Sequence, residues 1–222
     1  MFALQNEQTR EFHGLFLHIP KTAGSHVKSY VNDNYIGKWE FRHLADFLPY
    51  QHQNLPIDDM AHLTLDQAFQ MFPTLGDWIE DFNIDVFTIT RDPYERFVSC
   101  LRFLPNLMNL DIDRVGLPKF KGQLSEDQFH AIYTTLLLRP QAEWIMHEGK
   151  QWTRIIKLED VQDTIVSICG EVQVDFSKKT WTNEEAAKTT GLGFNIPHFH
   201  IQDDETRKFI EWLWKEDFDL GL

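Results

Sequence analysis

The chain has 222 residues, of which 42% are hydrophobic and 25% are charged, values typical of a globular protein with a large core. Its formal net charge of −13 argues against binding nucleic acid or anionic lipid through a broad surface, because such surfaces are basic. A small anionic ligand stays compatible with this charge, since a few local cations and backbone amides are enough to bind it. Two cysteines, Cys100 and Cys169, are too few for a disulfide framework or a zinc cluster.

The length fits one α/β domain, and we expect a single domain over residues 1–222. Residues 1–13 are polar and lack the apolar core of a secretory signal. No stretch approaches the roughly 20 apolar residues of a membrane span. We therefore expect a cytoplasmic protein.

Hydrophobic periodicity and turn residues divide the chain into alternating strands and helices. In chain order we expect a strand over residues 14–19, a helix after Ser25, an irregular stretch over 36–63, helices over 65–72 and 75–82, a strand over 85–90, a helix from Pro93, helices over 125–139 and 141–147, a strand over 154–158, a helix from Val161 and a last helix over 203–215. Pro20 ends the first strand, because proline cannot donate to a sheet ladder. Thr64 and Gln67 have the spacing of a capping box.

This alternation predicts the α/β class, with a P-loop-like, mainly parallel sheet flanked by helices. Ligands of such sheets bind outside the carboxyl ends of the strands. Two loops of the sequence leave strands at that end, after residues 19 and 90, and both carry side chains suited to phosphate or sulfate.

The first loop contains Lys21, Thr22, Ala23, Gly24 and Ser25 between a strand and a helix start. Small residues let the backbone approach a ligand, and the amides of a helix N-terminus favour an anion. The order differs from the nucleoside-triphosphate P-loop, which has an opening glycine and places its lysine after the small residues. The alternative is a plain strand–turn–helix corner with a surface lysine.

The second loop begins with Arg91, directly after the strand over residues 85–90. Ser99 follows about two helical turns into the next helix, away from its apolar stripe. An arginine can bind phosphate with two parallel hydrogen bonds, and Ser99 can add a hydroxyl donor. The alternative is that Arg91 pairs with Asp92 or Glu95 and that Ser99 is solvated.

Together, Pro-Lys-Thr-Ala-Gly-Ser at residues 20–25 and Arg-Asp-Pro-Tyr-Glu-Arg-Phe-Val-Ser at residues 91–99 resemble the sulfotransferase superfamily. The closer likeness is to its carbohydrate-sulfotransferase branch, which includes heparan sulfate 2-O-sulfotransferase. Weaker likenesses at residues 157–160, 193–195 and 203–210 follow in the same order. The resemblance implies a sulfotransferase fold and 3′-phosphoadenosine 5′-phosphosulfate as sulfuryl donor. The donor-binding residues it implies are Lys21, Thr22, Ala23, Gly24, Ser25, His26, Arg91, Ser99 and Asn195.

The resemblance implies transfer of the sulfuryl group to an acceptor hydroxyl, on a glycan or a small molecule. Lys21 beside the bridging oxygen would stabilise the leaving group, and a histidine would accept the hydroxyl proton. His62, just before a helix and upstream of the second loop, resembles the family's catalytic base. His43 is the next choice, and His18 in a buried strand favours a structural role.

Two other functions stay open at this point. The fold type also fits a small-molecule kinase that uses adenosine triphosphate, although the Walker order is absent. It equally fits a nucleotide-binding protein without catalysis. The pair His198 and His200 resembles half of a metal site, but no third ligand has a suitable spacing, and we expect no metal.

Overall fold

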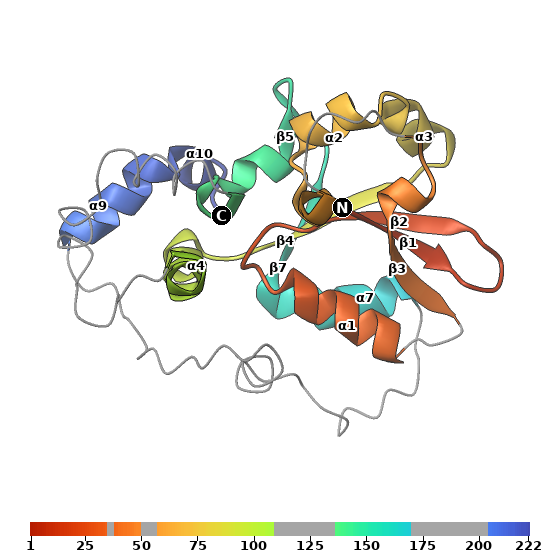
Figure 1. Ribbon diagram of the computed structural model, residues 1–222, viewed down its shortest axis with the longest axis horizontal. Helices are drawn as coiled ribbons and strands as arrows, with labels where there is room; N and C mark the ends of the chain where they lie inside the picture. The colour runs from red at the N-terminus through yellow and green to blue at the C-terminus, as the bar shows by residue number, and fades with distance from the viewer. Residues whose placement is uncertain (35–37, 50–56, 109–135, 170–203) are drawn as a thin grey trace. The chain divides into compact units, whose positions relative to one another are not determined.

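The computed structural model describes residues 1–34, 38–49, 57–108, 136–169 and 204–222 (Figure 1). The chain forms two compact units, one of residues 1–91 and 141–174 and the other of residues 92–140 and 175–222. The expectation of a single domain over residues 1–222 stays a prediction.

A five-stranded mixed sheet forms the centre of the first unit, with the strand order β3-β1-β2-β4-β7. Its strands are β1 (Phe2–Asn6), β2 (Phe12–Leu17), β3 (Trp39–His43), β4 (Asp85–Thr90) and β7 (Arg154–Lys157). Strands β2, β4 and β7 run parallel, whereas β1 pairs antiparallel with both β2 and β3. The α/β class is therefore confirmed. The expectation of a parallel sheet was wrong for β1, which runs opposite to the other four strands and makes the sheet mixed.

Strands β1 and β3 lie in segments whose sequence gives only a weak strand signal. Residues 1–13 are polar as a whole, yet Phe2, Ala3 and Leu4 are buried in β1. Strand β3 alternates buried Trp39 and Phe41 with partly exposed polar residues, within the stretch expected to be irregular. Both strands are stabilised by pairing with segments distant along the chain, which periodicity in a short window does not reveal.

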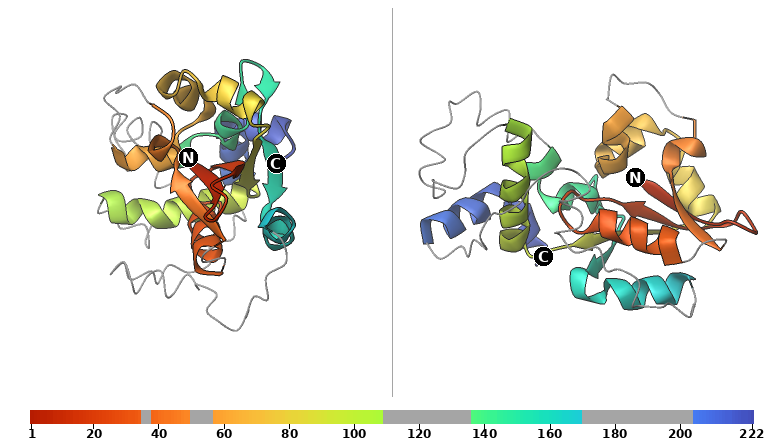
Figure 2. Two further views of the ribbon diagram at one scale, coloured as in Figure 1. Left: turned by 90° about the vertical axis from the view of Figure 1, so that its right-hand side faces the viewer. Right: turned by 60° about the horizontal axis from the view of Figure 1, so that its bottom comes forward.

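Helices cover both faces of this sheet (Figures 1 and 2). Helices α1 (Gly24–Asn34) and α7 (Val161–Cys169) lie on one face, and α2 (Leu65–Met71) and α3 (Leu75–Asp81) lie on the other. Alternate strand residues point to opposite faces, so each face has its own apolar set. The core under α1 and α7 consists of Phe2, Leu4, Phe16, Val27, Val31, Trp39, Phe41, Phe87, Ile89, Ile156, Ile165 and Cys169.

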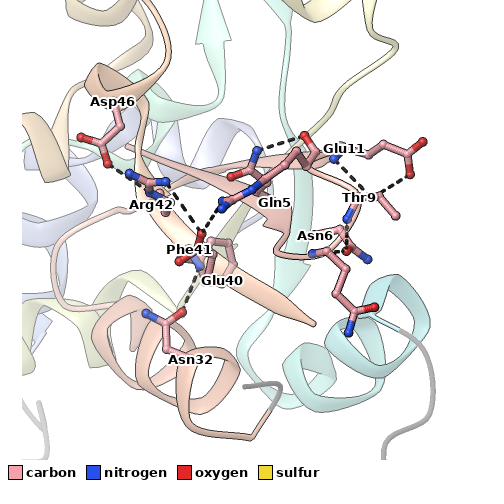
Figure 3. A network of polar contacts seen from close by, with 11 residues as sticks. Gln5, Asn6, Thr9, Glu11, Asn32, Glu40, Phe41, Arg42 and Asp46 are labelled. Atoms are coloured by element: carbon pink, nitrogen blue, oxygen red, sulfur yellow. Dashed lines mark hydrogen bonds and ion pairs between the residues drawn. The ribbon is translucent and has the colours of Figure 1, made fainter. Parts of the chain in front are cut away.

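Polar contacts fix the antiparallel edge of the sheet (Figure 3). The Asn32 side chain on α1 accepts a hydrogen bond of 2.9 Å from the Phe41 backbone N–H, which ties the helix to β3. Arg42 lies near two carboxylates, 3.9 Å from Glu40 and 3.4 Å from Asp46. These exposed pairs contribute little free energy each, but they complement the hydrophobic packing of α1 in holding β3 in place.

The second unit contains α4 (Pro93–Met108), a 3-10 helix (Leu136–Leu138), α9 (Asp204–Leu213) and α10 (Lys215–Asp219). The Asp92 carboxylate accepts a hydrogen bond of 3.0 Å from the Glu95 N–H at the start of α4. Fully buried Arg96 donates to the carbonyls of Arg139 and Leu137 and lies 4.6 Å over the Trp214 ring. The apolar core consists of Phe97, Cys100, Leu138, Ile210, Leu213 and Trp214.

The predicted strand over residues 85–90 agrees with the structure, as do the predicted helices after Ser25, over 65–72 and 75–82, from Pro93 and from Val161. The capping box of Thr64 and Gln67 is present, and Pro93 is the first residue of α4. The expected helix over 141–147 is instead a 3-10 helix (Gln141–Trp144) followed by β5 (Met146–His147), which pairs with β6 (Lys150–Gln151). The expected last helix is divided in two at Trp214. The helix expected over 125–139 lies mainly outside the described residues, and none of the described helices has the length and apolarity needed to span a bilayer.

Candidate functional site

Both predicted loops leave the sheet at one edge. Strands β2 and β4 are parallel neighbours, and their last aligned pair is Leu17 with Thr88. The Thr88 hydroxyl donates a 2.7 Å hydrogen bond to the Leu17 carbonyl, which fixes this register. Lys21 follows the end of β2 and Arg91 directly follows β4, so both belong to the carboxyl edge of the same unit. This arrangement of the backbone agrees with the one expected from the sequence.

The loop between β2 and α1 has an unusual backbone. Lys21 and Ala23 both have φ of 68°, in the left-handed region that glycine normally occupies. Each costs about 1 kcal/mol relative to a glycine there, and such strain is concentrated at functional sites. Left-handed residues that alternate with ordinary ones turn successive N–H groups toward one side, which is the geometry of an anion-binding nest.

Thr22, between these two residues, is fully buried. Its hydroxyl donates a 3.0 Å hydrogen bond to the Ile19 carbonyl and closes the turn. A hydroxyl has a single proton to donate, and that of Thr22 is used in this bond. Thr22 would therefore donate to an anion through its backbone N–H. Ser25, one turn further, is exposed.

Gly24, the first residue of α1, is required by the ring of His18. A Cβ built on Gly24 would lie closer than 3.0 Å to three ring atoms of His18, a separation that real Cβ atoms essentially never show. The sequence predicted that Gly24 gives a ligand access to the backbone. The described contacts give a second reason for glycine, which is close packing of the helix start against the buried imidazole.

The N-terminus of α1 lacks acidic side chains of its own and has two lysines nearby. Its first turn has no acidic residue, whereas each of the other described α-helices has at least one there. The pKa of His18 lies well below its usual value because of burial and then because of His62, the Met1 amine, Lys28 and Lys21. Of these neighbours, Lys21 and Lys28 are cations, whereas burial lowers the pKa of the Met1 amine well below its usual value. The helix dipole is thus not offset from within its own first turn, which favours an external anion.

His62 lies against the same strand end. It is the last residue of a 3-10 helix (Ile57–His62), and its ring centroid is 4.3 Å from that of His18. His62 Nδ1 is 3.0 Å from the His18 carbonyl oxygen. Because a carbonyl oxygen only accepts, Nδ1 carries the proton in the neutral ring and Nε2 carries the lone pair. This is the tautomer that a general base needs.

His43, the second choice for a base, also lies at this edge, at the end of β3. Its register partner in β1 is Phe2, and the two rings are 4.6 Å apart. Partial burial is the main cause that lowers the pKa of His43, followed by the Met1 amine and Lys28, while Asp46 opposes them. His43 is exposed, and no described contact fixes its tautomer as the His18 carbonyl does for His62.

Arg91 is held by a residue that the sequence did not single out. The buried side chain of Gln141 accepts a 3.0 Å hydrogen bond from the Arg91 N–H and donates a 2.9 Å bond to the Arg91 carbonyl. The two residues are 50 positions apart, so no local pattern indicates the contact. Lys28, one helical turn beyond Gly24, was likewise missed, although its spacing places it near the helix start.

The other predicted donor-binding residues are less well defined. Ser99 is partly exposed on α4 in the second unit, and its partnership with Arg91 stays a prediction. His26 lies in the first turn of α1. Asn195, together with His198 and His200, lies outside the described residues.

No group of three or more potential metal-ligating side chains occurs within the described part of the chain. Comparisons of the whole chain with protein-family models, with curated proteins and with solved structures give no match.

Proposed function

We propose that this protein is a sulfotransferase that moves the sulfuryl group of 3′-phosphoadenosine 5′-phosphosulfate to a hydroxyl of a carbohydrate acceptor. The observation that carries the proposal is the position of His62. Its Nδ1 is hydrogen-bonded to the His18 carbonyl just after β2, next to the strained loop that contains Lys21. A candidate base and a candidate anion-binding loop thus share one strand end.

The charges around this strand end fit a phosphosulfate. The amides at the start of α1 and the Lys21 ammonium would bind its oxygens, with Lys28 adding positive charge nearby. In an acidic protein, a local group of cations marks a preferred place for an anion. Arg91, directly after the adjacent parallel strand β4, is proposed to bind the 3′-phosphate of the same donor.

The proposed reaction is a direct in-line transfer. The acceptor oxygen forms a bond to sulfur while the bond from sulfur to the bridging oxygen breaks, and 3′-phosphoadenosine 5′-phosphate leaves. The acceptor proton passes to His62 Nε2. Lys21 would act mainly in the transition state, because the bridging oxygen gains negative charge only as the bond breaks.

The test separates donor binding from transfer. Wild type should bind 3′-phosphoadenosine 5′-phosphate more tightly than adenosine 5′-phosphate, and Arg91→Ala should abolish this preference. His62→Gln should retain donor binding and lose transfer of labelled sulfate to a panel of glycans. His13→Gln is the matched control, because His13 lies near the start of β2, whereas His62 contacts the chain just beyond the end of that strand.

Three outcomes would count against the proposal. Equal affinity for the two nucleotides would remove the donor assignment. Magnesium-dependent turnover of adenosine triphosphate would favour a kinase. Donor binding without transfer to any acceptor of a broad panel would favour a binding protein on the same fold.

A further inference from the structure

The Gln141 side chain acts on the Arg91 backbone as a neighbouring strand would. One planar amide donates to the carbonyl and accepts from the N–H of the same residue, at 2.9 and 3.0 Å. Among neutral side chains, only those of asparagine and glutamine offer a donor and an acceptor in this geometry. Gln141 has no exposed surface, so its amide group is shielded from water.

Arg91 needs such a partner because it has left the sheet. The last residue of β4 paired with β2 is Thr88, and the last paired with β7 is Thr90. The backbone groups of Arg91 therefore lie beyond both ladders, and buried backbone groups must find partners elsewhere. Two hydrogen bonds to one residue fix its peptide planes and hence the direction in which its side chain starts.

Gln141 is itself on a rigid support. It begins the 3-10 helix (Gln141–Trp144), whose last residue is fully buried. The Thr153 hydroxyl donates a 2.8 Å bond to the Trp144 carbonyl, and the Trp152 N–H donates to the Ile145 carbonyl at 3.0 Å. The segment is thus anchored immediately before β7, in the same unit as Arg91.

We propose that Gln141 is a positioning residue, which holds Arg91 in the place from which its guanidinium binds the 3′-phosphate of the donor. This rests on the function proposed above. Gln141 itself would not touch the nucleotide. It would determine how strongly the site distinguishes a donor with a 3′-phosphate from one without.

The experiment measures the ratio of the Kd of adenosine 5′-phosphate to the Kd of 3′-phosphoadenosine 5′-phosphate by calorimetry. Gln141→Leu removes both hydrogen bonds at similar size, and Gln141→Glu removes the donor while keeping an acceptor. We expect each to reduce the ratio about tenfold or more, because a charged group displaced by a fraction of an ångström loses its paired hydrogen bonds. Gln70→Leu, exposed on α2, is the matched control and should leave the ratio unchanged.

A role in folding alone would give a different result. Partial unfolding lowers the affinity for both nucleotides together, so a preserved ratio in both Gln141 variants would overturn the proposal. In an Arg91→Ala background, Gln141→Leu should have no further effect on the ratio, and an added loss would also overturn it. If wild type does not prefer the nucleotide with the 3′-phosphate, the proposed donor is wrong, and so is the proposed role of Gln141. If wild type shows the preference and the variants keep it, only the role of Gln141 falls.

Discussion

The contact between Gly24 and His18 gives the sharpest prediction for stability. Alanine at residue 24 would place its Cβ within 3.0 Å of three atoms of a buried ring. Overpacking of this kind costs about 1–3 kcal/mol, because neither the strand end nor the helix start can move freely. Gly24→Ala should therefore lower the free energy of unfolding by about that amount, measured by urea titration with circular dichroism.

Gly76→Ala is the matched control. Gly76 also lies in the first turn of a helix, but a Cβ there would meet only a side-chain atom of Phe69 at 3.5 Å, an ordinary contact. Alanine is the better helix former, so this change should raise the free energy of unfolding by up to about 1 kcal/mol. The two substitutions would then change the free energy of unfolding in opposite directions.

The clash itself is tested by removing the ring. In a His18→Ala background, Gly24→Ala should cost less than about 0.5 kcal/mol, because the space that the ring filled is vacant. An equal loss in both backgrounds would refute the steric explanation. So would a Gly24→Ala variant as stable as wild type.

Three further predictions concern capping, thiol reactivity and pH. Thr64→Ala should lower the free energy of unfolding by about 1 kcal/mol in urea titrations, whereas Thr74→Ala should have little effect, because only Thr64 caps its helix through its side chain. Burial raises the pKa of Cys169 to about 12, and Cys100 is also buried. At pH 8, neither thiol should therefore react quickly with a disulfide reagent until urea unfolds the chain. A fast reaction of the native protein would contradict this prediction. Folding lowers the pKa of His18, so the unfolded chain binds the proton more readily than the folded chain does. The contribution of His18 to stability is therefore complete above about pH 6.5 and is lost as the pH falls below that value. The loss is at most about 1.4 kcal/mol per pH unit. His18→Leu should flatten this part of the stability curve, and an unchanged slope would refute the assignment.

Local chemistry was enough to predict several elements correctly. The capping box at Thr64, the strand over residues 85–90 and the helix that begins at Pro93 depend on interactions within a few residues. The pairing of two loops at one sheet edge also followed from the sequence, because parallel neighbouring strands end on the same side.

Contacts between distant segments were not visible in this way. The antiparallel strands β1 and β3 form because the sheet supplies their partners, and the bond between Gln141 and Arg91 joins residues 50 positions apart. The tautomer of His62 depends on a carbonyl 44 positions away.

By itself, the sequence determined the α/β class, the position of most described helices and the two loops that carry the candidate site. The tertiary structure alone decided that the sheet is mixed, that Lys21 and Ala23 adopt left-handed backbone conformations, and which groups orient His62 and Arg91. The physical reason is the distance along the chain between the residues that interact. Capping and periodicity are short-range effects written in neighbouring residues, whereas strand pairing, backbone strain and side-chain orientation are set by segments that only folding brings together.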